Sequence, residues 1–277
     1  MLAERLPGIM PPMEPDQQLA AMAVHGIAGL PLGRLTQGVR PCRQPHHTIT
    51  RVGLMGGGRP IVPGEIALAN HGVLFLDELP EFQTQALEAL RQPLEDQHIV
   101  LHRIGQECRF STQFLLVAAM NPCPCGRLGH PTHPCTCSHG ARARYRNRLS
   151  GPLLDRIDLH LSLPPIRPAQ LRSSGPAESS ATVRERVKKA SAQQIERTPA
   201  GTANARLSPA ELDKVGAITS EARCLLEESA ERLALTARAY HRMLRVSRTI
   251  ADLAGAPRVE PPHVAEAVQY RDFSLEV

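Results

Sequence analysis

The stretch Val73-Leu-Phe-Leu-Asp77-Glu78 decides the fold class, because four consecutive apolar residues run directly into two adjacent carboxylates. A short apolar run of this kind is typical of a strand buried on both faces of a parallel sheet. A second such run, Gln113–Ala118, leads into Met120-Asn121-Pro122. Between the two runs, Phe82–Leu94 carries leucines at helical spacing, and His98–Arg103 suits one arm of a hairpin. Strand, helix and strand predict an α/β fold with a parallel sheet.

The polar residues after the two runs are the first candidates for chemistry. Ligands of open α/β sheets bind at the carboxyl ends of the strands. In P-loop nucleotide hydrolases an Asp there holds Mg²⁺, and in many a following Glu polarises the attacking water. Asp77 is therefore a candidate ligand of Mg²⁺ and Glu78 a candidate catalytic residue, and Asn121 could reach a γ-phosphate or the attacking water. The alternatives are a surface acidic pair that caps the next helix, and a simple Asn-Pro turn.

Two arginines follow patterns that suit contact with a phosphate. Arg156 comes after the apolar stretch Gly151–Leu154 and is a candidate to project toward a neighbouring subunit's nucleotide. The alternative is a surface salt bridge with Asp155 or Asp158. Arg238 begins a long arginine-rich helix, where a helix N-terminus also favours anions. Two later arginines of that helix compete for the same role: Arg242 and Arg245.

Composition changes along the chain predict two domains and a linker. Residues 1–165 mix short apolar runs with Gly and Pro, residues 166–181 are rich in Pro, Ser and Gly, and residues 182–277 are rich in Ala, Leu, Arg and Glu. The last region reads as an all-α domain. Two of its segments, Thr182–Glu185 and Ser208–Glu211, fit a capping box at a helix start.

Further signals place the last two helices of that region. From Thr236 onward, apolar residues recur at helical spacing as far as Leu253. Gly255 then offers a C-terminal stop. A final helix is expected to begin near Pro261–Pro262.

Four of the seven cysteines cluster in two C-x-C pairs. Cys123 and Cys125 form the first pair, and Cys135 and Cys137 form the second. Four thiolates in two close pairs suit tetrahedral Zn²⁺, so we expect a structural zinc site rather than unliganded thiols. Nearby histidines are alternative ligands: His130, His133 and His139. The remaining cysteines are expected to be core or incidental residues: Cys42, Cys108 and Cys224.

Composition excludes some classes of protein. The 277 residues are 42% hydrophobic and 21% charged, enough apolar material for a sizeable core. The longest apolar run, Phe114–Met120, is far below the roughly 20 residues of a membrane-spanning helix. The N-terminus lacks the pattern of a signal peptide, so we expect a cytoplasmic protein. A net charge of +5 permits contact with nucleic acid but does not demonstrate it.

A basic run follows the cysteines and offers a candidate contact for DNA. Four arginines surround Tyr145, and together they could meet phosphates and stack a base. The alternative is a solvated helix face. The arginines are Arg142, Arg144, Arg146 and Arg148.

The ordered set of motifs resembles the ComM/YifB family of magnesium-chelatase-like AAA+ ATPases, over essentially the whole chain. The segments that carry the resemblance are 40–48, 63–82, 121–126, 150–160 and 237–242. The resemblance implies Asp77 and Glu78 as Walker B, Asn121 as sensor 1, Arg156 as arginine finger and Arg238 as sensor 2. Residues near 40–60 become a candidate pore or DNA-contacting loop. It further implies ATP and Mg²⁺ as cofactors, a ring, expected to be a hexamer, and DNA processing such as branch migration or helicase activity.

One motif of that family is missing from the sequence. A P-loop ends in Gly-Lys-Ser/Thr, but no Gly-Lys pair occurs, since the lysines are Lys188, Lys189 and Lys214. We therefore expect an AAA+ core truncated just after the Walker A motif, without its first strand, that binds ATP poorly and leaves a sheet edge exposed. Two other functions stay open: a non-hydrolysing, zinc-stabilised module that binds nucleic acid or a partner, and another AAA+ class such as a transcriptional activator or a magnesium-chelatase subunit.

Overall fold

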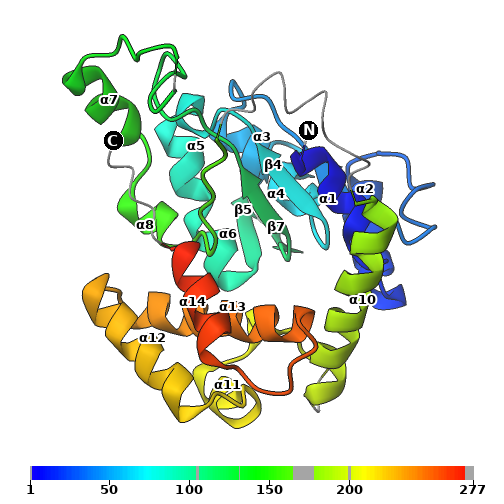
Figure 1. Cartoon of the computed structure of the whole chain (residues 1–277). Coiled ribbons are helices and arrows are strands. Elements are labelled where there is room, and N and C mark those ends of the chain that lie inside the picture. The colour runs from blue at the N-terminus through cyan, green and yellow to red at the C-terminus, as the bar shows by residue number, and fades with distance from the viewer. Residues whose placement is uncertain (1, 104–105, 131, 165–177, 199–200, 272–277) are drawn as a thin grey trace. The chain divides into compact units, whose positions relative to one another are not determined.

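Figure 1 shows the computed structural model of the chain, in which residues 2–103, 106–130, 132–164, 178–198 and 201–271 are described. The chain divides into two compact units, one ending at Ile157 and the other beginning at Asp158. Most of the expected linker, residues 166–181, lies outside the described residues.

The first unit is built on a parallel sheet of three strands. The strand order is β1 (Cys42–Arg43), β4 (Val73–Leu76) and β7 (Leu115–Ala118), and Leu76 pairs with Ala118. In Figure 1 the helices α5 and α6 lie along one side of β4 and β7. This confirms the predicted α/β fold with a parallel sheet.

The two predicted strands differ in burial. All four residues of β4 are buried, because the strand has a neighbour on each side. In β7 no residue is fully buried, and Leu115 is 45% exposed. The expectation that this run is buried on both faces is therefore wrong. The physical reason is that, among the described strands, β7 pairs with β4 alone.

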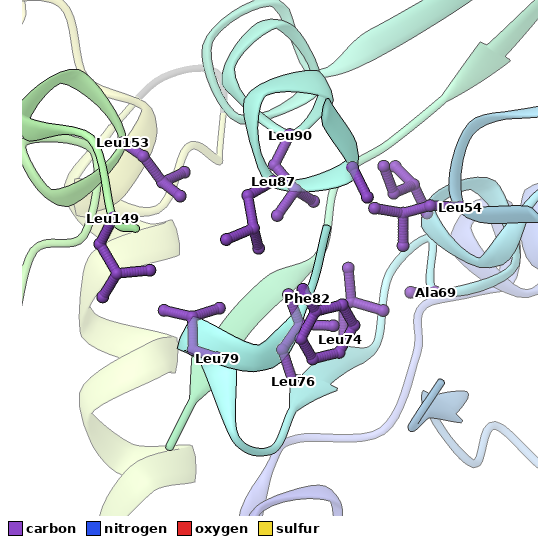
Figure 2. Close-up of a cluster of buried hydrophobic side chains, with 12 residues drawn as sticks. Leu54, Ala69, Leu74, Leu76, Leu79, Phe82, Leu87, Leu90, Leu149 and Leu153 are labelled. Atoms are coloured by element: carbon purple, nitrogen blue, oxygen red, sulfur yellow. The ribbon is translucent and has the colours of Figure 1, made fainter. Parts of the chain in front are cut away.

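The predicted helix between these strands is broken into shorter elements. The 3₁₀-helix η1 (Leu79–Glu81) is followed by α5 (Thr84–Ala89) and α6 (Arg91–Asp96). Pro93 has no N–H to donate to the carbonyl of residue 89, so the first helix cannot continue through it. The leucines at helical spacing nevertheless pack together. Figure 2 shows Leu87 and Leu90 pointing toward Leu74, Leu76, Leu79 and Phe82.

The remaining elements of the first unit are short helices and two hairpins. The hairpin β5–β6 pairs His98 with Ser111 and contains the predicted arm. A second, smaller hairpin is β2–β3, and Ile61, Ile99 and Phe110 from the two hairpins share one buried cluster. The bounds are α1 Leu2–Ile9, α2 Pro15–Ile27, α3 Arg51–Met55, β2 Gly56–Gly57, β3 Val62–Pro63, α4 Glu65–Leu68, β5 His98–Arg103, β6 Gln106–Ser111, α7 His139–Arg146 and α8 Gly151–Leu154.

The second unit is helical, as predicted. Its core gathers apolar residues such as Leu226, Met243 and Val264 from three different helices. No helix among the described residues of either unit is both long and apolar enough to cross a bilayer. The elements are α10 Ser180–Arg197, η2 Asn204–Arg206, α11 Pro209–Val215, α12 Ser220–Arg232, α13 Ala237–Leu253 and α14 Pro261–Gln269.

The helix ends test the capping signals. Ser208 and Glu211 form the predicted capping box of α11. The box predicted at Thr182 is wrong, because α10 begins earlier and Ser179 is its N-cap. The Ser179 hydroxyl accepts the N–H of Thr182 at 3.2 Å, so Thr182 already lies in the first turn. Gly255 follows α13 with a φ of +70°, a left-handed conformation that favours glycine and ends the helix as predicted.

Candidate functional site

Three of the predicted residues lie at the carboxyl ends of neighbouring strands. Asp77 and Glu78 follow β4 directly, and Asn121 follows β7. The Leu79 N–H donates to the Ala119 carbonyl at 2.9 Å, which ties the two loops together. We call this region, residues 77–81 and 119–122, the carboxyl edge. It is the part of a parallel sheet where ligands bind.

Glu78 has an unusual backbone conformation. Its φ of 54° and ψ of 46° are left-handed, which is costly for a residue with a Cβ atom. The Asp77 carboxylate accepts the Glu78 N–H at 3.0 Å and helps to hold this turn. The Glu78 side chain is 54% exposed, so a ligand can reach it. Strain of this kind clusters at functional sites.

Sequence reasoning missed the partner of Glu78. The His47 Nδ1 atom lies 3.2 Å from Glu78 Oε2. The His47 ring lies 4.1 Å from that of His46 and meets the edge of Phe82 at 6.4 Å. No spacing rule joins His47 to Glu78. Pairing of β1 with β4 brings them together, so histidines soon after a neighbouring strand were the signal available in the sequence.

Helix α7 packs against the carboxyl edge through Tyr145. The side chain is buried, and its hydroxyl accepts a hydrogen bond from the Asn121 backbone N–H. Burial and the charge of Glu81 raise the pKa of Tyr145, while the bond from Asn121 opposes the rise. A buried ring cannot stack on a nucleic-acid base, so that expectation is wrong.

The arginines of the basic run differ in their surroundings. Arg148 donates to the Pro80 carbonyl at 2.9 Å and to Glu81 at 2.7 Å. Arg144 is exposed, whereas Arg142 and Arg146 are half-buried. The run is therefore attached to the carboxyl edge at one end, and it is not a uniformly solvated face.

The four clustered cysteines come together in space. Their sulfur atoms all lie within 4.8 Å of one another, and Cys123 is buried. The Sγ of Cys123 lies 3.4 Å from that of Cys125 and 3.6 Å from that of Cys135. Four sulfurs around Zn²⁺ at about 2.3 Å would be about 3.8 Å apart, so the cluster is nearly the right size for this ion. We call these four residues the cysteine cluster.

Backbone groups favour a thiolate at Cys125, whereas burial raises the pKa of Cys137 to about 12 and the pKa of Cys135 is also raised. The N–H groups of Arg127 and Thr136 hydrogen bond to the Cys125 sulfur and lower its pKa to about 5. Such bonds stabilise the deprotonated sulfur that a metal ion requires. The alternative ligand His130 is turned to its own loop, where its Nδ1 accepts the His133 N–H at 3.1 Å. Among the described residues, no histidine belongs to this group of ligand atoms.

Arg156 is folded back onto its own unit. Its side chain is 10% exposed and forms an ion pair with Glu95 of α6, and it also donates to the Pro152 carbonyl at 2.7 Å. The ion-pair partner of Arg156 is therefore Glu95, and Asp158 pairs with Arg242 instead. The Arg156 Nε is buried without a hydrogen-bond partner among the described residues.

Arg238 belongs to the second unit, in the first turn of α13. The Thr236 hydroxyl caps this helix by accepting the Ala239 N–H at 3.2 Å, and the Arg238 side chain is exposed. The two competing arginines have internal partners. Arg242 pairs with Asp158 at 3.0 Å, and Arg245 donates to the carbonyl of residue 207.

Comparison with known proteins accounts for nearly the whole chain. Residues 1–171 match the family model described as magnesium chelatase, subunit ChlI, and residues 177–271 match the model of its C-terminal part. The chain is 44% identical over 272 residues to "Competence protein ComM" of Haemophilus influenzae. It belongs to the ComM/YifB family. It is also 41% identical to "Uncharacterized protein YifB" of Salmonella typhimurium and 39% identical to "Uncharacterized protein Mb2921c" of Mycobacterium bovis.

The alignments cover nearly all of this chain but only part of each relative. Each alignment includes 98% of this chain but only 53–54% of the relative, so the chain spans about half the length of the curated relatives it matches. In this ComM/YifB chain, the first family model covers the carboxyl edge, the cysteine cluster and Arg156. The second covers the helices that follow, including Arg238.

Proposed function

We propose that this ComM/YifB chain is part of a Mg²⁺-dependent ATPase whose hydrolysis site includes the carboxyl edge. The observation that supports this most strongly is the juxtaposition of the Asp77–Glu78 pair with Asn121 at the ends of two paired strands. Carboxylate oxygens suit Mg²⁺, and an adjacent exposed carboxylate can take the proton of an attacking water. Among the described residues named here, these are the exposed acidic and amide side chains at the carboxyl ends of paired parallel strands.

Each residue has a distinct role in this proposal. Asp77 holds Mg²⁺, Glu78 polarises water, and Asn121 orients the water or the γ-phosphate. Arg156 leaves Glu95 and neutralises charge on a neighbouring subunit's nucleotide, and Arg238 contacts the phosphates from the helical unit. The role of Arg156 requires a neighbouring subunit, and we propose that the subunits form a hexameric ring in the cytoplasm.

DNA is the proposed macromolecular substrate. The relative from Haemophilus influenzae is named a competence protein, and the resemblance to its family suggests branch migration or helicase activity. The segment 40–60 ends in the glycine-rich start of hairpin β2–β3, where Arg59 is exposed. An exposed arginine at such a turn suits a phosphate backbone. Arg144 of α7 is a second exposed cation for this contact.

A structural Zn²⁺ at the cysteine cluster completes the proposal. The cluster supplies four sulfur ligands and N–H groups directed at one of them. The ion would add stability to a segment with little regular structure. Free thiols kept as metal ligands also suit the reducing cytoplasm.

A second candidate function is a module that binds a partner without hydrolysing ATP. The sequence has no Gly-Lys pair, and therefore no Walker A lysine for the β- and γ-phosphates. In that case the chain would act by assembling with longer relatives, to which it could lend Arg156. A magnesium-chelatase subunit is a further alternative within the same family models.

Binding of Mg·ATP by the purified chain tests the first proposal. We would titrate the wild type, Glu78→Gln and Asp77→Asn by calorimetry, with Glu107→Gln on the exposed hairpin as the matched control. Mg²⁺-dependent binding that Asp77→Asn weakens about tenfold or more would support the site. Glu78→Gln should bind as well as the wild type, because that residue acts on water and not on the metal.

The second candidate is tested by mixing the chain with the longer ComM relative. Stimulation of the relative's ATPase rate by the wild-type chain, and loss of that stimulation with Arg156→Ala, would support a partner role. Lack of binding in the first experiment together with stimulation in this one would replace the first proposal by the second. Lack of both would contradict each of them.

A further inference from the structure

Helix α7 connects the cysteine cluster to the carboxyl edge. It begins at His139, two residues after the last clustered thiol, Cys137. Its N-cap Ser138 accepts the Ala141 N–H at 3.2 Å, so the first turn is fixed directly beside the thiols. The position of the thiols therefore determines where this helix starts.

The first contact of α7 with the carboxyl edge is made by Tyr145. The Tyr145 side chain is 8% exposed, and its hydroxyl accepts the Asn121 N–H. On its other side, Asn121 precedes the first clustered thiol, the fully buried Cys123, by two residues. Asn121 is thus linked to the cysteine cluster in two ways. One is the hydrogen bond to Tyr145 of α7, and the other is the short stretch of chain to Cys123.

The second contact involves the segment that follows Glu78. Arg148, just beyond α7, donates to the Pro80 carbonyl and pairs with Glu81. The next residue, Leu149, is buried in the same apolar cluster as Leu79, and Figure 2 shows the two side chains facing one another. Helix α7 and the residues directly after it therefore contact both loops that carry the polar residues.

The loop between the thiols has no regular structure of its own. No helix or strand is present in the described residues from 123 to 137. The sulfur atoms bring the two ends of this loop together, with Cys123 and Cys135 at 3.6 Å. A metal ion on the four sulfurs would turn this approach into a fixed link.

We propose that the cysteine cluster is a positioning device for the carboxyl edge. A thiolate-bound Zn²⁺ fixes the start of α7, and α7 fixes the separation between Asn121 and the loop that carries Asp77 and Glu78. This inference rests on the proposed function in its use of a metal ion at the cluster. It adds that metal loss alters the nucleotide-binding edge, so that the site responds to zinc supply.

Hydrogen exchange measured by mass spectrometry tests this link. The 277-residue chain would be compared with Zn²⁺ bound and after removal of the ion by a chelator. We expect exchange in residues 79–81, 119–122 and 139–146 to rise about tenfold or more, because these segments lose a shared constraint. Helix α13 of the second unit should be unchanged. Substitution by Co²⁺ reports the tetrahedral thiolate site through its visible absorption.

Four variants separate a positioning role from general loss of stability. Cys135→Ser should reproduce the effect of the chelator, and Cys224→Ser, at an exposed thiol of α12, should have no effect. Cys135→His can still ligate Zn²⁺ and should restore most of the protection. Tyr145→Phe should keep the metal and still raise exchange in residues 119–122, while residues 79–81 stay protected by Arg148.

The outcomes distinguish the positioning role from the proposed Zn²⁺ site on which it depends. A chain that binds neither Zn²⁺ nor Co²⁺ would contradict the metal site, and the positioning role would fall with it. A chain that binds the ion through the four thiols, yet shows the same exchange at the carboxyl edge after its removal, would overturn the positioning role alone. Loss of protection confined to residues 79–81, 119–122 and 139–146 would support it.

Discussion

Each compact unit of this chain contains a prominent group of charged side chains, and the two groups lie in opposite settings. In the second unit Arg248 and Asp252 are buried, and the Asp252 carboxylate accepts bonds from Arg248, Arg197 and Asn204. In the first unit Glu78 is 54% exposed, has a strained backbone and lies 3.2 Å from His47. The hydrogen bonds of the buried Asp252 carboxylate are all made within the fold, whereas the exposed Glu78 carboxylate is accessible to a ligand. Charge alone therefore does not indicate a functional site, and the proposal for Glu78 depends on its exposure and its strained backbone as well.

Breaking the buried network should give the largest effect. Asp252→Ala leaves the fully buried Arg248 guanidinium without its carboxylate, and we expect the helical unit to lose about 3–5 kcal/mol of stability. Burial already lowers the pKa of Arg248, and Asp252 acts against that. Hydrogen exchange of α13 measures the unit separately from the sheet. A loss below about 1 kcal/mol would contradict the structural role of the network.

Relieving the strain at Glu78 should give a smaller effect of opposite sign. Glu78→Gly removes the Cβ atom that makes a φ of 54° costly, so we expect a gain of about 1 kcal/mol in the first unit. Thermal unfolding followed by circular dichroism measures it. Gln97→Gly, at a φ of 56° outside the site, should give a similar gain. A gain at Gln97 with a loss at Glu78 would show that the pair with His47 stabilises the fold.

An exposed ion pair in the second unit can be compared with the buried network of Asp252 in the same unit. Arg223 and Asp213 lie 3.5 Å apart, and the Asp213 side chain is 58% exposed. Asp213→Ala should change stability by less than about 1 kcal/mol, because water screens both charges. The same exchange experiment on the helical unit detects this. A loss of stability close to that of Asp252→Ala would mean that burial does not explain the different contributions of the two pairs to stability.

The smallest expected effect depends on pH and concerns the cap of α11. Hydrogen bonds from the Ser208 hydroxyl and backbone lower the pKa of Glu211 below its ordinary value. A lowered folded pKa means that the carboxylate stabilises the fold above the unfolded pKa, and that this is lost as the pH falls through the folded pKa. The difference in melting temperature between wild type and Glu211→Gln should therefore shrink at acid pH. A difference that grows with acid would contradict this.

Local patterns in the sequence were sufficient for much of the fold. The apolar run before Asp77 is a strand, Ser208 and Glu211 form a capping box, and His98–Arg103 is a hairpin arm. Each of these depends on residues close together in the chain, where periodicity and capping rules apply. The box predicted at Thr182 failed because a competing serine three residues earlier caps the helix instead.

The surroundings of the candidate site could not be predicted in the same way. The partners His47 and Glu78, Arg156 and Glu95, and Tyr145 and Asn121 lie between 24 and 61 residues apart in the chain. Only the packing of the sheet and its helices brings them together, and no spacing rule joins such pairs in one sequence. The thiols were different, since the two C-x-C pairs indicate a shared site by their own spacing.

The register of β4 against β7 makes the carboxyl edge sensitive to length. Leu76 pairs with Ala118, and Asn121 follows three residues later. Deleting one residue of β7 would draw Asn121 back by about 3.3 Å and turn its side chain to the other face. The hairpin β5–β6 closes on itself, so insertions there leave this distance intact. We therefore expect insertions at the hairpin to be tolerated, whereas a change in the number of residues from Leu115 to Asn121 should disrupt the carboxyl edge.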